Sequence, residues 1–561
     1  MSNDRLNTET SPTPDKDWEA TALSFVENTT TKAPDNKPPK KRRFNNRTLT
    51  VILSSVFTVV VAIAVLLMTL LGGEQVQSNT DDGDTTQSTQ ADNGTNPAIV
   101  LLDKTGDADK GITASRLASI DIKNKEDAFT IRYDETAKSY VIKGYEDIDL
   151  DASLITTLRK FTETITATDQ VQSVSSLAAF GLDNPQSTAA ITFSDGSTAT
   201  VSIGNQTPSK SGYYTQIKGD DNVYIFDTNA VTLFRATAPA FASTQLIATP
   251  TIKTDDKYGT ALLRDITLSG SAFSSPLSLR RSNHNDSEEM SYFSYLITTP
   301  YFRAVRDSVA NALGQFKGMS ADQALFLHPT DEQLKKLGFH SPLFTIEATM
   351  AVETEEETKS EDEVAKKIYY NSAEYRITVG SKDENGNYIV MMDGIDAIFL
   401  VGKVSYSYLF DMTYENTVNE FLFVKNIDSI SRVNIRYNGN EHEFTLSHYP
   451  NKEDADDQLV IKEGDKVYST SDFRNLYGLM LKLERHGQTD KKPDSDVPLE
   501  ITLYDLSGEL CLSAKYYNAS GSLCVVETNE NELFTTRWSY ISFFIQQVDN
   551  YLNGRDVLIN T

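Results

Sequence analysis

Short runs of alternating apolar and polar residues recur along the chain from about residue 118 onward, separated by turn residues. The runs "ASIDIKN", "AFTIRYD" and "SYVIKGY" within residues 118–145 alternate in this way, and period-2 alternation predicts strands whose one face is buried. The next stretch, "DASLITTLRKFTETI", has a helical period instead. Asp151 is its expected N-cap, and one face carries four apolar residues: Leu154, Leu158, Phe161 and Ile165. The pattern therefore predicts an antiparallel sheet accompanied by a helix.

The same predicted order of strands, helix and strands recurs three times along the chain. "FGLDNPQSTAAITF" begins at Phe180 and "LGFHSPLFTIEATM" begins at Leu337, each with a Gly, a Pro three residues after the following apolar position, and an apolar strand-like run. Gly181 and Pro185 are explained by a turn with positive φ and a rigid entry into a strand. The expected helices of the second and third copies present these apolar faces: Val305, Val309, Leu313 and Phe316 in "YFRAVRDSVANALGQF", and Phe473, Leu476, Met480 and Leu483 in "SDFRNLYGLMLKLERHG".

We therefore predict an α+β body of three repeated antiparallel-sheet-plus-helix units. Repeat 1 is expected over 101–250, repeat 2 over 251–424, and a diverged repeat 3, which lacks the Gly of the turn, over 425–561. Repeat 2 carries an acidic insertion, "ETEEETKSEDEVAKK", within the range 351–367. So much charge favours an exposed hairpin tip. Neighbouring repeats are expected to pack into one elongated body.

A single long apolar segment lies ahead of this body. Residues 48–73 contain no charged residue, and about 20 apolar residues suffice for a helix to cross the hydrocarbon core. Six basic residues lie within 37–47, directly before the segment, and none follows it before residue 97, so the N-terminus is expected in the cytoplasm and the body outside it. Residues 1–47 are predicted to form a disordered cytoplasmic tail, and 74–100 a flexible stalk.

Charge and cysteine content narrow the function classes. The chain of 561 residues has a formal net charge of −27, although residues 1–47 are slightly basic. An acidic body repels phosphate backbones, which argues against nucleic acid as a partner. Two cysteines, Cys511 and Cys524, have neither zinc nor redox spacing. A single disulfide between them is one reading, and two buried, unreactive thiols are the favoured one.

The sequence indicates no catalytic, metal-binding or cofactor-binding residues. Motifs for metalloproteases, serine hydrolases and phosphate-binding loops are missing. His442 and His448 lie six residues apart on an expected strand, about 20 Å, too far to share a metal. Asp147, Asp149 and Asp151 alternate, but a turn into a helix cap explains them better than a calcium loop. Aromatic residues in the strands are expected to pack the sheets, with a glycan-binding groove as the alternative.

Several motifs together resemble a known family. "FGLDNP", "VSIGNQTP", "GYYTQIKG" and "NVYIFDTNAVTLF" are similar to the motifs of the bacterial domain-of-unknown-function family 4340. The likeness is specific over roughly residues 113–235, fainter over 264–410, and His340 replaces the Asp of the turn in the second copy. The resemblance implies a membrane-anchored envelope protein, often encoded beside ABC-type transporters of the gliding-motility kind. It implies no catalytic residues.

Three functions follow as expectations, in this order. The first is a non-catalytic, single-pass membrane scaffold or accessory protein of the cell envelope that meets other envelope proteins, such as an ABC-type transporter. The second is a module that binds a glycan or a peptide in the envelope. The third is an envelope hydrolase of unrecognised type.

Overall fold

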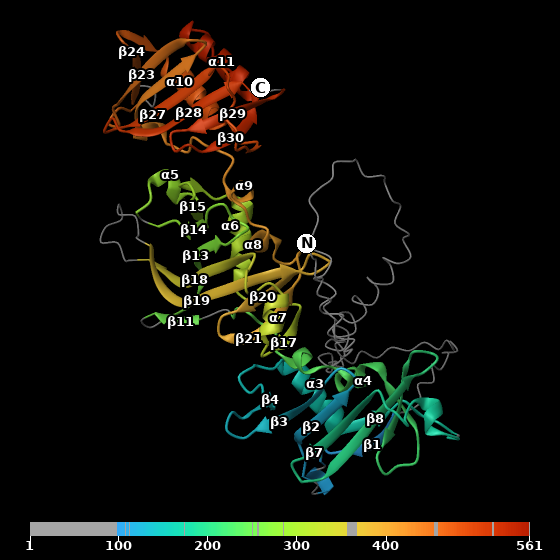
Figure 1. Ribbon diagram of the computed structural model, residues 1–561. Helices are drawn as coiled ribbons and strands as arrows, with labels where there is room; N and C mark the ends of the chain where they lie inside the picture. Colours follow the sequence, from blue (N-terminus) through green and yellow to red (C-terminus); the bar gives the residue numbers. More distant parts are fainter. Residues whose placement is uncertain are drawn as a thin grey trace, which may run out of the picture. The chain divides into compact units, whose positions relative to one another are not determined.

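The computed structural model describes residues 98–559 with short gaps at 107, 111–112, 173, 249–250, 255–256, 284, 356–366, 454–457 and 519–520. The chain divides into two compact units. The first contains the described residues up to Thr244 with Gln323–Pro329 and Ile395–Ala397, and the second contains Gln245–Asp322, Thr330–Gly394 and the residues from Ile398 onward. Three large antiparallel sheets make up most of the structure (Figure 1).

The first large sheet has eight strands. Their order across the sheet is β4 (Ser139–Ile142), β3 (Ala128–Asp134), β2 (Leu117–Asn124), β7 (Ser187–Phe193), β8 (Thr198–Gln206), β9 (Gly212–Ile217), β10 (Tyr224–Asp227) and β6 (Asp169–Gln170). Helices α3 (Ala152–Glu163) and α4 (Thr228–Arg235) accompany it, with a small pair of strands, β1 (Ile99–Asp103) and β5 (Thr164–Ala167). Strand β7 alternates buried and half-buried residues along its length, as a sheet with one covered face requires.

The second large sheet has nine strands. Their order is β16 (Arg303–Ala304), β15 (Tyr295–Thr299), β14 (Leu277–Arg281), β13 (Leu262–Ser269), β18 (Phe344–Glu355), β19 (Lys367–Lys382), β20 (Tyr388–Met392), β21 (Ile395–Val401) and β17 (Gln323–Leu327). The helices in this stretch are short: α5 (Glu288–Ser291), α6 (Asp307–Leu313), α7 (Asp331–Lys336), α8 (Ser407–Phe410) and α9 (Tyr414–Thr417). A separate two-stranded sheet, β11 (Thr251–Thr254) with β12 (Lys257–Thr260), precedes the large one.

The third large sheet also has nine strands. Their order is β25 (Lys466–Tyr468), β24 (Leu459–Glu463), β23 (Asn440–His448), β22 (Ile430–Tyr437), β27 (Leu499–Asp505), β28 (Leu510–Asn518), β29 (Leu523–Thr528), β30 (Leu533–Arg537) and β26 (Gly487–Gln488). Helices α10 (Thr470–Leu481) and α11 (Trp538–Leu552) pack against each other and share one apolar core with this sheet. That core includes Phe473, Leu476, Ile541 and Phe544 from the helices.

The three sheets have the same strand order when the strands are matched by position, except that the described part of the first sheet has no counterpart of the edge strands β16 and β25. Strands β2, β13 and β22 each pair with the next strand along the chain on one side, and with β7, β18 and β27 on the other. In each case a helix, α3, α6 or α10, lies between these two groups of strands in the sequence. This agreement in topology is what the repeated sequence pattern predicts. Antiparallel sheet dominates, however, and the helices are few and mostly short, so the α+β description overstates the helical part.

The glycine–proline turn is the same joint in the first two sheets. Gly181 and Gly338 have φ of 69° and 88°, the left-handed region that favours glycine. After each turn the chain enters its strand through an equivalent bond: the Gln186 amide donates to the Ile203 carbonyl at 2.7 Å, and the Leu343 amide donates to the Val379 carbonyl at 2.9 Å.

A second glycine lets the turn approach the end of the neighbouring strand. A Cβ atom at Gly204 would lie 2.2 Å from the Phe180 carbonyl oxygen, and one at Gly380 would lie 2.4 Å from the Leu337 carbonyl oxygen. Both contacts are with backbone, so no side chain can rotate away to relieve them. The two glycines of each motif thus have a structural role, as the sequence predicts for Gly181.

Two of the three predicted helix faces need correction. In α3 the buried residues are Ile155, Leu158 and Thr162, one position away from the predicted stripe, whereas Leu154 and Phe161 are half-buried. Thr162 can lie on the buried face because its hydroxyl donates to the Leu158 carbonyl. The helix ends at Glu163, and Ile165 belongs to strand β5.

The predicted second helix begins six residues later than expected. Arg303 and Ala304 pair with β15 as strand β16, and Val305 forms a bridge with Val418, so tertiary pairing overrides the helical pattern until Asp307. Leu313 and Phe316 are buried as predicted, with Ala310 in place of Val309. The four residues predicted for the third helix face, Phe473, Leu476, Met480 and Leu483, are all buried, but α10 ends at Leu481, so Leu483 lies just beyond it.

The insertion in repeat 2 extends a hairpin. Strands β18 and β19 pair from Phe344–Val379 to Glu355–Lys367 with one shift of register between Met350 and Ala351, well beyond the lengths of β7 and β8. The tip, 356–366, lies outside the described residues, as do the predicted tail, 1–47, and transmembrane segment, 48–73. Among the described residues, no helix combines the length and apolar character needed to cross a membrane.

Candidate functional site

The aspartates singled out in the sequence do not converge on one site. Asp151 caps α3, where its carboxylate accepts from the amides of Ser153 and Leu154 at 2.8 and 2.9 Å, which confirms the predicted cap. Asp147 instead contacts the His328 ring nitrogen Nε2 at 2.8 Å. The carboxylates of Asp147 and Asp151 therefore have separate structural partners.

The histidines are also dispersed. His442 Nδ1 lies 2.7 Å from Glu463 Oε1, and His448 Nε2 lies 2.7 Å from the Ile430 carbonyl oxygen. His340 contacts Asp331 at 3.0 Å, and His284 lies outside the described residues. In the part of the chain that the structure describes, no three His, Cys, Asp or Glu residues come together as metal ligands would.

The two cysteines are free thiols on adjacent strands. Cys524 pairs with Asn518 across the β28–β29 ladder, seven residues along β28 from Cys511, so the register separates the two sulfur atoms. Burial raises the pKa of both thiols, that of Cys524 to about 11. Because the thiolate is the reactive form, both are poor nucleophiles. The favoured expectation of free, unreactive thiols holds, but only Cys524 is fully buried, and Cys511 is half-buried.

A buried cluster of charges joins the second and third sheets within the second compact unit. Glu532, in the turn between β29 and β30, is only 1% exposed. Its carboxylate accepts from Arg303 at 2.7 Å, from the Tyr414 hydroxyl at 2.6 Å, and from Arg485. Arg303 comes from β16 of the second sheet, and Arg485 follows α10 of the third. We call Arg303, Tyr414, Arg485 and Glu532 the charge cluster.

The Glu532 carboxyl of the charge cluster is held in its ionised form. Burial by itself raises the pKa of the Glu532 carboxyl, but the guanidinium groups of Arg485 and Arg303 outweigh burial and hold this pKa below its usual range. Burial and the Glu532 carboxylate together raise the pKa of the Tyr414 hydroxyl. A carboxylate bound to two arginines neither donates nor accepts a proton near neutral pH. The geometry therefore suits a structural joint rather than acid–base chemistry.

A second carboxylate connects the same two parts of the chain. The Glu289 carboxylate of α5 accepts from the Asn426 amide at 3.0 Å and from the Ser429 hydroxyl at 2.8 Å. Burial raises the pKa of Glu289, but hydrogen bonds, including those from Ser287, Asn426 and Ser429, outweigh it and lower the pKa to about 2.

The second compact unit is therefore expected to lose stability as the pH falls from about 4 to about 2. A carboxyl whose pKa is lower in the folded state stabilises the fold above its unfolded pKa, about 4.3, and this contribution disappears as the pH falls through the folded value. Urea unfolding followed across this range should show a steeper loss for the natural chain than for Glu289→Gln. Equal slopes would mean that Glu289 is not held in its ionised form.

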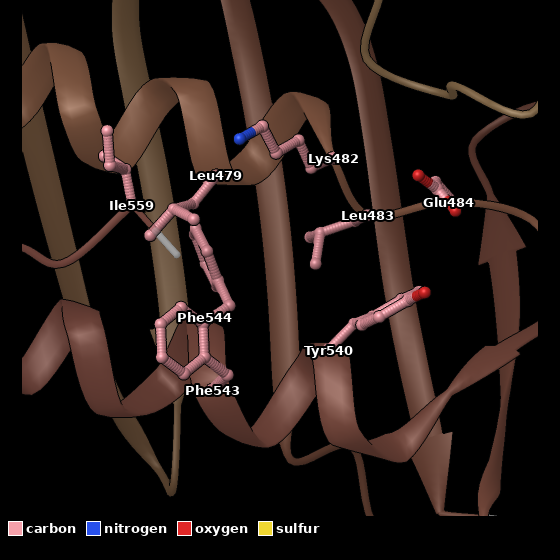
Figure 2. A pocket seen from close by; sticks show the side chains of 8 residues that line it. All are labelled: Leu479, Lys482, Leu483, Glu484, Tyr540, Phe543, Phe544 and Ile559. Carbon is pink, nitrogen blue, oxygen red and sulfur yellow. The ribbon is translucent and has the colours of Figure 1, made fainter. Parts of the chain in front are cut away.

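A hollow in the described surface lies between α10 and α11, the two helices that cover the third sheet. It has a volume of about 330 Å³, at the lower end of the range for ligand sites. Its lining combines apolar and charged side chains from α10, from the residues that follow it, from α11 and from the C-terminal segment (Figure 2): Leu479, Lys482, Leu483, Glu484, Tyr540, Phe543, Phe544 and Ile559. We call it the α10–α11 groove.

The C-terminal segment is fixed against the helices beside this groove. The Leu558 amide donates to the Gln547 side chain at 3.0 Å, and the side chain of Val557 is buried. Ile559 is half exposed and lines the groove. An adjoining hollow of about 520 Å³ continues along α11, lined by Ser539, Tyr540, Ser542, Phe543 and Gln546.

Sequence reasoning identified neither the charge cluster nor the groove. The stretch "RWSYISFFIQQVDNYL" is apolar and rich in aromatic residues, and this composition is the one sequence signal that points to this region. The four members of the charge cluster come from residues 303 to 532, and no local pattern links such distant positions.

Comparison with known proteins gives one match. Residues 141–286 match the family model of a domain of unknown function, DUF4340; no curated protein and no solved structure matches the chain. The match begins within β4 and ends shortly after β14. The matched segment therefore contains β7 to β10 of the first sheet but not β2 and β3 of that sheet. It contains instead their equivalents in the second sheet, β13 and β14. Residues 141–286 are thus similar to the DUF4340 family of domains of unknown function, which confirms the resemblance that the sequence motifs predict.

Proposed function

We propose that this protein is a non-catalytic scaffold or accessory protein of the cell envelope. In this proposal, residues 48–73 anchor it in the membrane, the body lies outside the cytoplasm, and the body serves as an auxiliary subunit of an ABC-type transport system. The transporter partner follows from the family resemblance. The observation that best supports the scaffold function is the presence of three sheets that share one topology.

Repeated sheets suit a scaffold because each can present a broad surface to another protein. The face of the third sheet that α10 and α11 do not cover is polar, and ion pairs connect neighbouring strands across it. Arg436 contacts Glu441 and Glu500 at 3.3 and 3.7 Å, and Lys515 also contacts Glu500, at 3.8 Å. Exposed pairs of this kind add little stability. They keep a sheet face soluble and offer charges of both signs to a partner.

A ligand-binding module is the second candidate. Phe180 and Tyr214 form a half-buried ring pair with centroids 4.8 Å apart, within the residues that match the family. Aromatic rings at a surface can stack on a sugar ring or a peptide side chain. The envelope hydrolase comes last, since no observation on the described residues favours it.

Topology gives the first test. Protease added to intact spheroplasts is expected to degrade the body and to leave a protected fragment of roughly the first 72 residues, because the basic flank keeps the N-terminus inside. Immunoblotting with an antibody to the N-terminal tail checks this outcome. If the whole body is protected, the proposed location is wrong.

Purification of the full chain from its own membranes in mild detergent tests the scaffold function. We expect it to co-purify in stoichiometric amounts with the membrane-spanning subunits of an ABC-type transporter, identified by mass spectrometry. A chain that purifies alone, and whose melting temperature rises with envelope glycan fragments, would support the ligand-binding module instead.

A further inference from the structure

We propose that the α10–α11 groove and the adjoining hollow form a docking site for an amphipathic helix of a partner protein. The partner helix would carry apolar residues at i, i+3 and i+4, flanked by one acidic and one basic side chain. This inference rests on the proposed scaffold function and specifies how the third sheet's layer of helices would engage a partner.

The two hollows have the shape that a helix surface complements. Tyr540 and Phe543 line both of them, and these residues lie three positions apart on α11, so they form a ridge between the hollows. Ridges of this spacing are what a second helix accommodates between its own side chains. Apolar residues one turn apart on the partner would enter the hollows on either side of the ridge.

The site extends along the helix axis. Its α11 residues run from Ser539 to Gln546, about 10 Å at 1.5 Å per residue, or two helical turns. Ser539 and Ser542 are exposed and small, so a second helix can come as close as about 8–10 Å between axes. An elongated occupant uses both hollows, whereas a compact small molecule would fill only one.

The charges at the rim select the occupant. Lys482 and Glu484 line the groove (Figure 2), and neither side chain has a hydrogen-bond or ion-pair partner in the part of the chain that the structure describes. An anionic amphiphile would meet Lys482 favourably but would be repelled by Glu484. A helix with an acidic residue facing Lys482 and a basic residue facing Glu484 satisfies both.

Selection from a displayed library of random peptides of about 16 residues, roughly 24 Å as helices, tests the proposal on the purified full chain in detergent. We expect enriched peptides to carry apolar residues at helical spacing with an acidic and a basic residue beside them. They should bind at least about tenfold more weakly to Phe543→Glu and to Ser542→Arg. Ser542 is exposed, so its variant blocks the hollow without touching the core, and Asp549→Lys on the same helix is the matched control.

Charge reversal gives a readout that misfolding cannot imitate. Selection on the double variant Lys482→Glu, Glu484→Lys should enrich peptides in which the two charges exchange places. Peptides with alternating, strand-like patterns, peptides that bind Ser542→Arg as well as the natural chain, or an absence of enrichment would each overturn the proposal.

The test separates this inference from the proposed function. If the chain with Ser542→Arg still co-purifies with its transporter subunits, the scaffold function stands and the docking site is wrong. If the natural chain selects helical peptides at the groove but co-purifies with no envelope protein, the docking site stands and the transporter assignment falls.

Discussion

Replacing Glu532 by glutamine is expected to lower the free energy of unfolding of the second compact unit by about 3–5 kcal/mol, the cost of breaking a buried ion pair. The substitution keeps the size of the side chain but leaves the guanidinium groups of Arg303 and Arg485 without their shared counter-charge. Urea denaturation followed by hydrogen exchange of β16 and β30 measures the effect where the cluster lies.

A neighbour provides the control. Glu530 also contacts Arg303, at 2.6 Å, but its side chain is 41% exposed, so Glu530→Gln should cost less than about 1 kcal/mol. Replacing Arg303, Arg485 and Glu532 together by apolar residues should recover much of the loss, since a buried ion triad can be exchanged for well-packed apolar groups. Equal effects of Glu530→Gln and Glu532→Gln would show that burial of the cluster is not what matters.

Leu158→Ala is expected to destabilise the first compact unit by about 2–5 kcal/mol, the range for truncation of a buried leucine. The Leu158 side chain is completely buried, and it lies between Ile155 and Thr162 on the buried side of α3. Hydrogen exchange of β2 and β7 in the full chain reports the stability of the sheet in the same unit.

The control for this prediction lies four residues away on the same helix. Leu154 is half-buried, so Leu154→Ala should cost clearly less than Leu158→Ala. A larger cost at Leu154 would restore the helix face that the sequence pattern predicts and contradict the one described here.

Local sequence patterns were enough to predict most of the strands and the repeated turn. Alternation located the strands, and the repeated turn motif located equivalent joints because Gly181 and Gly338 must adopt positive φ. The predictions of helix bounds and helix faces were wrong where contacts outside the hydrophobic pattern decide the structure. Strand β16 forms because β15 pairs with it, and Thr162 can be buried because its hydroxyl donates to the Leu158 carbonyl. A hydrophobic pattern contains neither fact.

The candidate sites were less predictable than the fold. Tyr540, Phe543 and Phe544 lie on one apolar helix and form one side of the groove. The remaining lining residues come from α10, from the residues that follow it and from Ile559, and only the packing of the third sheet brings the two sides together. The charge cluster needs four residues from positions 303 to 532, so it follows from the tertiary structure alone.

The limits of the family match have a practical consequence for expression of the domain. A fragment cut at 141 and 286 would remove β2, which pairs with β7 from Leu117–Phe193 to Asn124–Ser187. The amide and carbonyl groups along that side of β7 would then be open to pairing with other chains, and β13 would likewise lack β18. Such a fragment should aggregate, whereas fragments whose limits follow complete sheets keep every interior strand paired. The segment that matches the family, residues 141–286, therefore begins and ends about two strands later in the chain than a complete sheet does.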